Sequence, residues 1–548
     1  MTSAPFFTTS DPATPSKFGP RTGRIRLDRG DGSHVLDTET PALLIATSRG
    51  VVPHLTRDHV HLTTAIRHVQ LPFESFLDRN PPVPTLVEGP HPLHSFLGYR
   101  PESHALILTL RDPSDGRKMP PNGTDFVSAQ CTRGVRKASL AAWKEYAHKC
   151  SPDLVVALSD TPLTPPPHSQ KRLTKSIERS IAWLAETLRE PSPSRSRPPR
   201  VLVHLAGGAS SPARAEFSDR LTERIELKDA AGLAPLDTLD DGVAGYVFDL
   251  LPLHMAILAD SEQADAPNAS LEDFVHVSDR QRSSPQSSER LVELLHASLS
   301  PLSAQKPRIV NSPVSPHEIL RLVRDIGVDL IDSFWAQRAA DIGIALDFAF
   351  PAPSPLQSAE VPPPRIREAE KLDLGHNLFD HAYAHDHSRL AATFLDGRAA
   401  QAGTELPVCP CGACSPQSPA SRLLHSPVDH LAWADKPPAT LQPPFVRSYI
   451  HHLLHTHEMS SHTLLTMHNM HVLDAFLAGI RAVLARPNGK EELDREIKIF
   501  ERAYDEGMAL WDEAERVWLE VERARGKGRL AREKEKQEAS TIGTAVEL

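Results

Sequence analysis

Short apolar runs that alternate with helical segments constrain the fold of this chain more than any other feature. Each run is rich in Val, Ile and Leu and is bounded by Gly, Pro or Asp, which is typical of strands buried on both faces of a parallel sheet. The seven clearest runs are PALLIATS (41–48), HALILTL (104–110), DLVVALSD (153–160), RVLVHLAG (200–207), AGYVFDLL (244–251), PRIVNS (307–312) and VDLIDSF (328–334).

Helical patterns lie between several of these runs, at residues 175–190, 212–226, 288–299 and 315–327. The last helix is predicted in most detail, with Ser315 as N-cap, Pro316 in the first turn, Glu318 at the third position and Gly327 after the end. Repeated strand–helix alternation predicts an α/β fold with a parallel sheet. Seven or eight such units favour a (β/α)8 TIM barrel over an open sheet.

Composition divides the chain into five predicted regions. Four Pro/Ser-rich insertions interrupt the barrel pattern, at residues 161–170, 190–200, 260–288 and 351–364. The predicted regions are a flexible N-terminus (1–14), the barrel with its insertions (15–405), a zinc-binding subdomain (406–485), charged C-terminal helices (486–531) and a disordered tail (532–548).

The charged C-terminal segment carries apolar residues at helical spacing. We interpret it as an amphipathic helix packed on the barrel, with a helix that faces a partner or RNA as the alternative. The apolar positions are Leu493, Ile497, Phe500, Ala503, Leu510, Trp511, Val517 and Leu519.

Charge and hydropathy exclude several classes of protein. The formal net charge of −10 gives no general attraction to nucleic acid, so any RNA contact needs a local basic face. No apolar stretch is long enough for a membrane span, and the N-terminus lacks the pattern of a signal or transit peptide. We expect a soluble, cytoplasmic protein, with peripheral attachment to the mitochondrial outer membrane as an open alternative.

Three of the five cysteines lie within six residues, in the segment CPCGAC. Cys409, Cys411 and Cys414 have a spacing that lets one tight loop present three thiolates to a single Zn²⁺ ion. Cys131 and Cys150 are interpreted as ordinary buried thiols. A fourth ligand must come from elsewhere, and residues 451–471 supply seven histidines: His451, His452, His455, His457, His462, His468 and His471. Three Cys and one His would make a closed, structural zinc site.

Several motifs together resemble the tRNA-guanine transglycosylase family, over about residues 15–485 without the long insertions. These motifs are TPALLIATSRGVVPHLT (40–56), KPRIVNSPVSPHEILRLVRDIGVDLIDSF (306–334) and CPCGAC followed by RSYIHHLLHTHEMSSHTLLTMHNMH (447–471). The family's zinc ligands are three cysteines and the histidine of a His-Asn pair, which implies Cys409, Cys411, Cys414 and His468 here. The segment between Cys414 and Tyr449 is longer than is usual in the family, so His425 and His430 within it stay open as competing ligands.

The resemblance also implies what chemistry to look for. Family enzymes exchange guanine for queuine or its precursors at the tRNA wobble position, through an Asp nucleophile and a second Asp that handles protons. Asp332 stands at the position of the nucleophile, with a structural strand-end aspartate as the alternative.

The other catalytic motifs of the family are altered. The Asp-Ser-Gly-Gly-Phe-Gln signature is missing, and RDPSDGRKMPPN (111–122) follows the strand instead. Ser159 stands in place of the base-recognition Asp, with Asp160 one residue on, and DDGVAGYVFDLL (240–251) replaces a Gly-rich turn. We therefore predict that this chain has no catalytic residues of its own.

This pattern resembles the non-catalytic subunit of the eukaryotic enzymes. It implies a heterodimer with a catalytic subunit of the same fold, contacts with tRNA through that complex, and one structural zinc ion. Arg447, Arg481 and Arg486 are candidates to meet phosphate, with solvated surface charges as the alternative. Two other hypotheses stay open: an active transglycosylase that uses Asp332, and a zinc-stabilised RNA-binding or assembly module.

Overall fold

A computed structural model describes residues 5–10, 16–30, 35–164, 166–189, 199–226, 232–261, 285–353, 361–367, 370–399, 406–417, 440–521 and 523. Large parts of the predicted insertions at 190–200, 260–288 and 351–364 lie outside these residues, as does the predicted tail at 532–548. Among the described residues, no helix has the length and hydropathy needed to cross a membrane.

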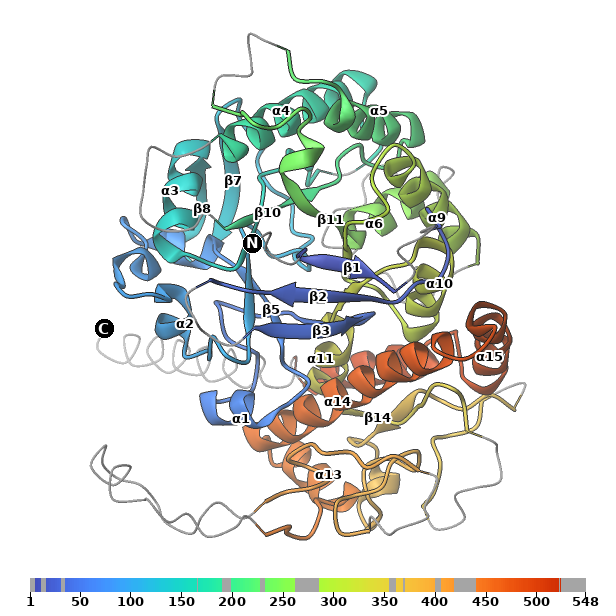
Figure 1. The fold of residues 1–548 in the computed structure, drawn as a ribbon. Coiled ribbons are helices and arrows are strands. Elements are labelled where there is room, and N and C mark those ends of the chain that lie inside the picture. The colour runs from blue at the N-terminus through green and yellow to red at the C-terminus, as the bar shows by residue number, and fades with distance from the viewer. Residues whose placement is uncertain are drawn as a thin grey trace, which may run out of the picture.

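Eight parallel strands form a closed barrel at the centre of the molecule (Figure 1). Going around the barrel, the strands are β4 (Ala42–Ile45), β5 (His68–Pro72), β6 (Ala105–Thr109), β9 (Leu154–Val156), β10 (Arg200–His204), β11 (Val243–Asp249), β12 (Arg308–Asn311) and β13 (Leu330–Asp332). The predicted (β/α)8 barrel is confirmed, and all seven apolar runs of the sequence are strands of it. The missed strand is β5, in which His68 and Gln70 interrupt the apolar run although every residue is buried.

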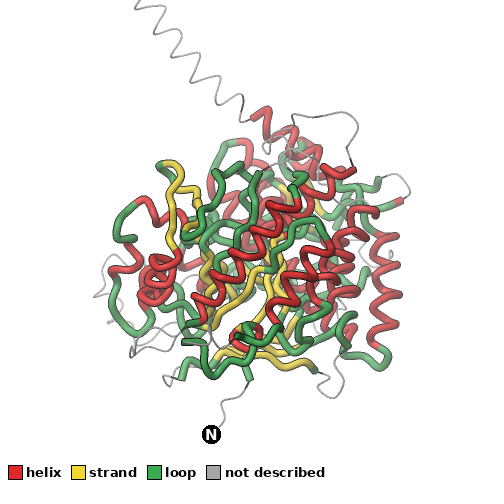
Figure 2. Tube along the Cα trace, turned by 90° about the horizontal axis from the view of Figure 1, so that it is seen from above, coloured by secondary structure: helices red, strands yellow, loops and turns green. Residues whose placement is uncertain are grey.

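Helices surround the strands, which lie in the interior when the molecule is seen from above (Figure 2). Helix α10 shows why the local sequence determines the element. The Ser315 hydroxyl accepts a hydrogen bond from the backbone N–H of Glu318, and Gly327 ends the helix with φ 69°. A Cβ atom at Gly327 would lie 2.6 Å from the Gly19 carbonyl oxygen, so glycine is required there. The helices of the barrel region are α1 (Arg57–Leu62), α2 (Pro92–Leu97), α3 (Leu140–Cys150), α4 (Gln170–Leu188), α5 (Ser211–Thr222), α6 (Leu250–Ser261), α9 (Pro285–Leu299), α10 (Pro316–Ile326) and α11 (Phe334–Asp341).

The N-terminal residues form a small sheet across one end of the barrel, and the prediction of a flexible segment at 1–14 is wrong for part of it. Strand β1 (Phe7–Thr9) pairs antiparallel with β2 (Gly23–Leu27), which pairs with β3 (Leu36–Thr40). Phe7 and Ile25 are buried in one cluster with residues of the barrel strands, including Leu44 and Leu202. This apolar contact fixes the segment, and the sequence alone does not reveal it because the strand is only three residues long.

Two short antiparallel pairs are attached to the barrel. Strands β7 (Phe126–Cys131) and β8 (Gly134–Ser139) form a hairpin, and β14 (Ile344–Leu346) pairs with β15 (Gly375–Asn377). The second pair belongs to the region that carries the cysteine motif.

The C-terminal part is helical, with α13 (Arg447–His455), α14 (Met459–Leu484), α15 (Gly489–Ala503) and a helical segment at 509–521. Helix α14 packs against α11 of the barrel (Figure 1). Trp511 stacks on Trp335 of α11 with ring centroids 4.6 Å apart, so the charged C-terminal segment packs on the barrel as an amphipathic helix. At its far end, Val517 and Leu519 remain 37% exposed.

Candidate metal centre and the cavity at the barrel mouth

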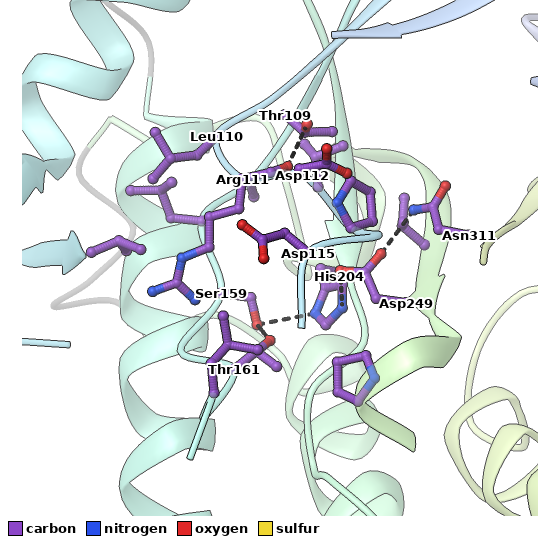
Figure 3. Close-up of a pocket in the computed structure, with 18 of the residues that line it drawn as sticks. Thr109, Leu110, Arg111, Asp112, Asp115, Ser159, Thr161, His204, Asp249 and Asn311 are labelled. Atoms are coloured by element: carbon purple, nitrogen blue, oxygen red, sulfur yellow. Dashed lines mark hydrogen bonds and ion pairs between the residues drawn. The ribbon is translucent and has the colours of Figure 1, made fainter. Parts of the chain in front are cut away.

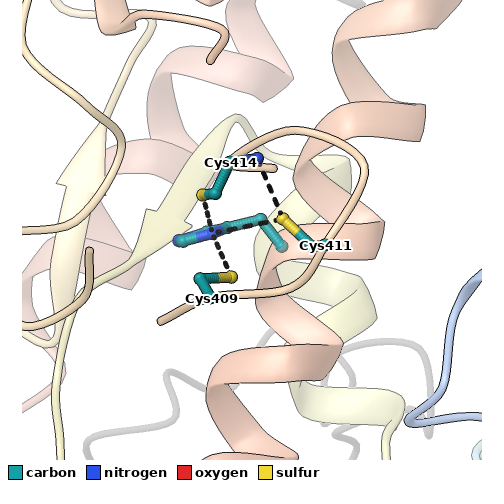
Figure 4. A group of neighbouring side chains, drawn as sticks. Cys409, Cys411 and Cys414 are labelled. Carbon is teal, nitrogen blue, oxygen red and sulfur yellow. Dashed lines mark hydrogen bonds between the residues drawn. The ribbon is translucent and has the colours of Figure 1, made fainter. Parts of the chain in front are cut away.

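The three cysteines of CPCGAC converge on one imidazole. Figure 4 shows their side chains reaching from a single loop toward a ring on a helix. That ring belongs to His468 in the middle of α14, and its Nδ1 lies 3.8, 4.0 and 3.3 Å from the Sγ atoms of Cys409, Cys411 and Cys414. All four side chains are buried.

This geometry fits a single tetrahedral metal ion. With metal–sulfur bonds of about 2.3 Å and a metal–nitrogen bond of about 2.0–2.1 Å, the nitrogen and each sulfur of such a site lie about 3.6 Å apart. The observed distances bracket that value. Because all four positions come from protein side chains and are sealed from solvent, the cluster is of the closed, structural kind.

Hydrogen bonds around the cluster prepare His468 to bind metal. Its Nε2 lies 2.8 Å from the Leu346 carbonyl oxygen, and a carbonyl can only accept, so Nε2 carries the proton. Nδ1 therefore presents its lone pair to the three sulfurs, as in metal sites whose histidine donates its other N–H to a backbone carbonyl. Burial opposes the thiolate of Cys411, but the neighbouring thiols of Cys409 and Cys414 hydrogen-bond to it and help to lower its pKa below the usual range of a thiol.

Asn469 ties the same helix turn to strand β14. Its Oδ1 accepts from the backbone N–H of Leu346 at 2.9 Å, and its Nδ2 donates to the carbonyls of Ile344 at 2.9 Å and Ala336 at 3.2 Å. The His-Asn pair thus connects the metal cluster, β14 and the first turn of α11 through buried polar groups whose hydrogen bonds are satisfied.

The other candidate histidines of the segment have different partners. Among the described residues, His468 is the one that groups with the three cysteines. His462 contacts the Ala340 carbonyl, and His471 contacts the Met467 carbonyl. His425 and His430, the competing candidates in the insert, lie outside the described residues.

A cavity of about 80 Å³ lies where the barrel strands end, which is the face that carries the active site in enzymes of this fold (Figure 3). Small-molecule sites usually enclose about 300–1,000 Å³, so this cavity is small. Polar residues from several strand ends line it: Gln70, Thr109, Arg111, Asp112, Asp115, Ser159, His204, Asp249 and Asn311.

Asp332, at the end of β13, lies beneath this cavity and is not among the described residues that line it. It is 1% exposed, and its carboxylate accepts hydrogen bonds from the backbone N–H groups of Ser312 at 2.8 Å and Phe334 at 3.3 Å. Burial, with smaller contributions from the neighbouring Asp112 and Asp249, raises the pKa of Asp332 to about 7. A nucleophilic carboxylate must be ionised and reachable, and this one is held by the backbone and is partly protonated at neutral pH.

Ser159 and Asp160 point in different directions. The Ser159 hydroxyl faces the cavity and lies 3.1 Å from Nδ1 of His204 (Figure 3). Asp160 is fully buried and is held by two hydrogen bonds from Arg172 (2.8 and 2.9 Å) and one from Arg179 (3.0 Å). Since its carboxylate is committed to these arginines, Asp160 does not replace a base-reading group in the cavity.

Sequence reasoning missed the polar groups that do line the cavity. His204 bridges Ser159 and Asp249, with its Nε2 3.1 Å from the Asp249 carboxylate, which also accepts from Asn311 at 2.8 Å. Burial would raise the pKa of Asp249, but His204 and Asn311 outweigh it and lower it. Burial lowers the pKa of Arg111 to about 10. Their place in the sequence could have identified these residues, because His204, Asp249 and Asn311 are each the last residue of a barrel strand.

The basic candidates for phosphate contact differ in accessibility, and the prediction for Arg447 is wrong. Arg447 is fully buried, where it pairs with Asp386 at 3.2 Å and donates to the Pro362 carbonyl. Arg481 is part-buried and donates to the Pro41 carbonyl. Arg486 is the most exposed of the three, at 44%, and its guanidinium pairs with Glu492 at 3.2 Å.

A (β/α)8 barrel with an attached Cys₃His cluster, whose ligands come from a loop and a long helix, is the class of protein that fold and site define. The family model for queuine tRNA-ribosyltransferase matches residues 16–239 and 440–500. The chain therefore belongs to the queuine tRNA-ribosyltransferase family. The match contains His468 and Asn469, whereas the three cysteines and strands β11 to β13 lie in the gap between its two parts.

The chain aligns over most of the length of curated relatives, among them three proteins that are each named "queuine tRNA-ribosyltransferase accessory subunit 2". The protein of Schizosaccharomyces pombe is 25% identical over 472 residues, which cover 85% of this chain and 78% of the relative. That of Ixodes scapularis is 25% identical over 470 residues, 84% of this chain and 93% of the relative. That of Drosophila virilis is 23% identical over 471 residues, 86% and 87% of the two chains.

Proposed function

We propose that this chain is the non-catalytic subunit of a heterodimeric queuine tRNA-ribosyltransferase. In this role it supports the exchange of guanine for queuine at the wobble position of tRNAs with GUN anticodons, those for Asp, Asn, His and Tyr. The observation that carries the proposal is the state of Asp332, the residue at the nucleophile position, whose buried carboxylate is occupied by two backbone N–H groups. The names of the relatives support the same role.

The cavity supports a chain that does not process a base by itself. A site that selects guanine needs hydrogen-bonding groups aimed at the base edge, because unpaired polar groups are what reject wrong substrates. Here Ser159 takes the place of the base-recognition carboxylate, and Asp160 is bound to two arginines. The remaining space, about 80 Å³, is small for a base with its ribose.

We propose that the ion of the Cys₃His cluster is Zn²⁺. Three sulfurs and one imidazole are a donor set typical of structural zinc. Bound there, the ion would hold the loop of residues 406–417 to helix α14 and supply no reaction chemistry, since the cluster leaves no open position.

We propose that the surface of α13 and α14 contacts the catalytic subunit, in the cytoplasm. Tyr449 on α13 is 44% exposed and Met459 at the start of α14 is 79% exposed. Aromatic residues and Met are enriched at protein interfaces. Replacing Tyr449 by Asp should weaken the heterodimer, measured by gel filtration of the mixed subunits, whereas Leu62→Asp, at a residue that is 71% exposed on α1, should not.

The test of the main proposal is incorporation of labelled guanine into tRNA by the purified chain, alone and mixed with a catalytic subunit. We expect no exchange by the chain alone and more exchange by the mixture than by the catalytic subunit alone. Asp332→Asn should leave the activity of the mixture unchanged. Exchange by the chain alone that disappears in Asp332→Asn would instead establish an active transglycosylase, and failure to associate at low salt would favour an unrelated zinc-stabilised module.

A further inference from the structure

Three histidines gather on the outer side of α13, apart from the Cys₃His cluster. His451 and His455 stand one turn apart on the helix, and His381 belongs to the short helix η5 (His381–Tyr383) beside it. One nitrogen from each lies within 4.8 Å of the others. The ring centroids of His451 and His455 are 4.2 Å apart, and that of His381 is 5.3 Å from His455.

Backbone carbonyls determine which nitrogen each helix histidine offers. Nδ1 of His451 lies 2.9 Å from the Leu378 carbonyl oxygen, and Nε2 of His455 lies 2.9 Å from that of Phe379. Both nitrogens must donate, so the lone pairs are on Nε2 of His451 and Nδ1 of His455. Among the described residues, neither of these two atoms has a hydrogen-bond partner.

The arrangement repeats what His468 does in the Cys₃His cluster. There too a backbone carbonyl holds one ring nitrogen and thereby directs the lone pair of the other toward the ligand position. His455 is further held by the Phe379 ring, which stacks on it with centroids 4.1 Å apart. Two of the three imidazoles are thus fixed before any ligand arrives.

We propose that His381, His451 and His455 form a second metal site, which takes one divalent first-row transition-metal ion such as Zn²⁺. Three imidazoles are ligands that suit Zn²⁺, Cu²⁺ and Ni²⁺, and the fourth position stays open to water. Nitrogens around a tetrahedral ion lie about 3.3 Å apart, which is less than the 4.8 Å within which these three nitrogens lie. His381 is exposed and can turn inward to close the difference, while His451 is 8% exposed and stays in place.

This site differs from the Cys₃His cluster in the solvent exposure of its ligands and in the segments that a bound ion would link. It shares no ligand with that cluster, it has no thiolate, and one of its ligands faces solvent, so its ion exchanges readily. A bound ion would link α13 to the turn after β15, through His381 and the residues whose carbonyls already contact the helix.

The experiment is a zinc titration of the full-length chain after a weak chelator has removed loosely held metal and left the Cys₃His cluster filled. Calorimetry and elemental analysis should find one further equivalent of Zn²⁺ per chain. His381→Ala and His455→Ala should each weaken that second equivalent by about 100-fold, since loss of an outer-shell partner alone costs about 10–100-fold. The matched control is His452→Ala, an exposed histidine on the same helix, which should bind as the unmodified chain does.

Two results would overturn the proposal. One is no uptake of Zn²⁺ by the unmodified chain beyond the equivalent that the Cys₃His cluster already holds. The other is a second equivalent that survives His381→Ala, or that is lost equally in His452→Ala, which would indicate unspecific binding to a histidine-rich surface. Because His381 is exposed, the His381→Ala variant should unfold at the same temperature as the unmodified chain without metal at the second site. Loss of binding in this variant therefore cannot be ascribed to misfolding. Added Zn²⁺ should raise the unfolding temperature of the unmodified chain but not of this variant.

Discussion

The metal cluster and the cavity at the barrel mouth differ in what they keep of the family pattern. In the cluster, three sulfurs and one nitrogen converge, and the polar side-chain atoms of His468 and Asn469 all have partners. At the barrel mouth, the carboxylate of Asp332 is buried under backbone donors, and Ser159 lines the cavity at the position where the resemblance implies a base-recognition carboxylate. The proposed non-catalytic role accounts for this difference, because a subunit that serves as a partner needs the structural cluster but not a working reaction site.

The difference also concerns how each region is held. The cluster would be held by one bound metal ion, because three buried thiols and a buried imidazole have little else to pair with. The aspartates below and behind the cavity depend on protein groups alone. Their substitution should therefore affect stability without affecting the exchange reaction, and four predictions separate the two regions.

The largest effect is expected from Cys414→Ser. Removing one thiolate should reduce the metal that remains after treatment with a weak chelator from one ion to near zero per chain, and the stability drawn from apparent zinc affinities of about 10–16 kcal/mol should be lost from the subdomain. Elemental analysis and limited proteolysis of residues 406–485 would measure both. Cys131→Ser is the matched control, because Cys131 lies outside the cluster and its Sγ already donates to the Glu74 carbonyl. Retained metal in Cys414→Ser would mean that another group closes the site.

The sequence predicted these two regions unequally for a physical reason. The cysteine spacing is local, so the chain itself shows the thiolates, and α10 follows from Ser315 and Gly327 at its ends. His468 lies far along the chain and came only from the family resemblance. Ser159 contacts His204, and His204 contacts Asp249, so these contacts join the ends of three strands. They could not be predicted, because the spacing of residues along the chain does not show how the ends of barrel strands lie relative to one another. Arg447 was predicted as a candidate for phosphate contact because its charge is visible in the sequence. Its burial against Asp386 is not visible there, and this is why the prediction is wrong.

The next largest effect is expected from Asp160→Asn, which breaks a buried ion pair and leaves Arg172 and Arg179 without their carboxylate. Removal of one partner from such a pair costs about 3–5 kcal/mol. Urea unfolding would measure the loss, with Asp219→Asn on an exposed helix face as control. Exchange by the mixed subunits should be unchanged at temperatures where the variant is folded. A selective loss of exchange with normal stability would assign Asp160 a role in the cavity.

Asp332→Asn should change the pH dependence of stability. The pKa of Asp332 is raised from its ordinary value of 3.8 to about 7 in the folded chain. Between these two pH values the folded state therefore keeps a proton that the unfolded state has released. Its contribution is greatest below pH 4 and is lost as pH rises to about 7, by at most about 1.4 kcal/mol per pH unit. Urea unfolding at pH 5, 6 and 7 should show the variant gaining stability relative to the unmodified chain as pH rises. A constant difference would mean that Asp332 is ionised throughout and that its backbone donors outweigh its burial.

The smallest effect is expected from Ser159→Ala, and it tests whether the cavity still has a task. The Ser159 hydroxyl is part-buried and contacts His204 at 3.1 Å, with Thr161 and Ser180 more distant at 3.4 Å. Water in the cavity can replace it, so stability should change by less than about 0.5 kcal/mol, and exchange by the heterodimer should be unaffected.

Ser176→Ala, just behind the cavity, is the contrasting variant. Its buried hydroxyl donates to the Asp160 carbonyl, and its loss should cost about 1–1.5 kcal/mol. If Ser159→Ala instead lowered exchange while Ser176→Ala did not, the cavity would contribute to base exchange, and the contrast between a preserved metal cluster and an abandoned reaction site would fail.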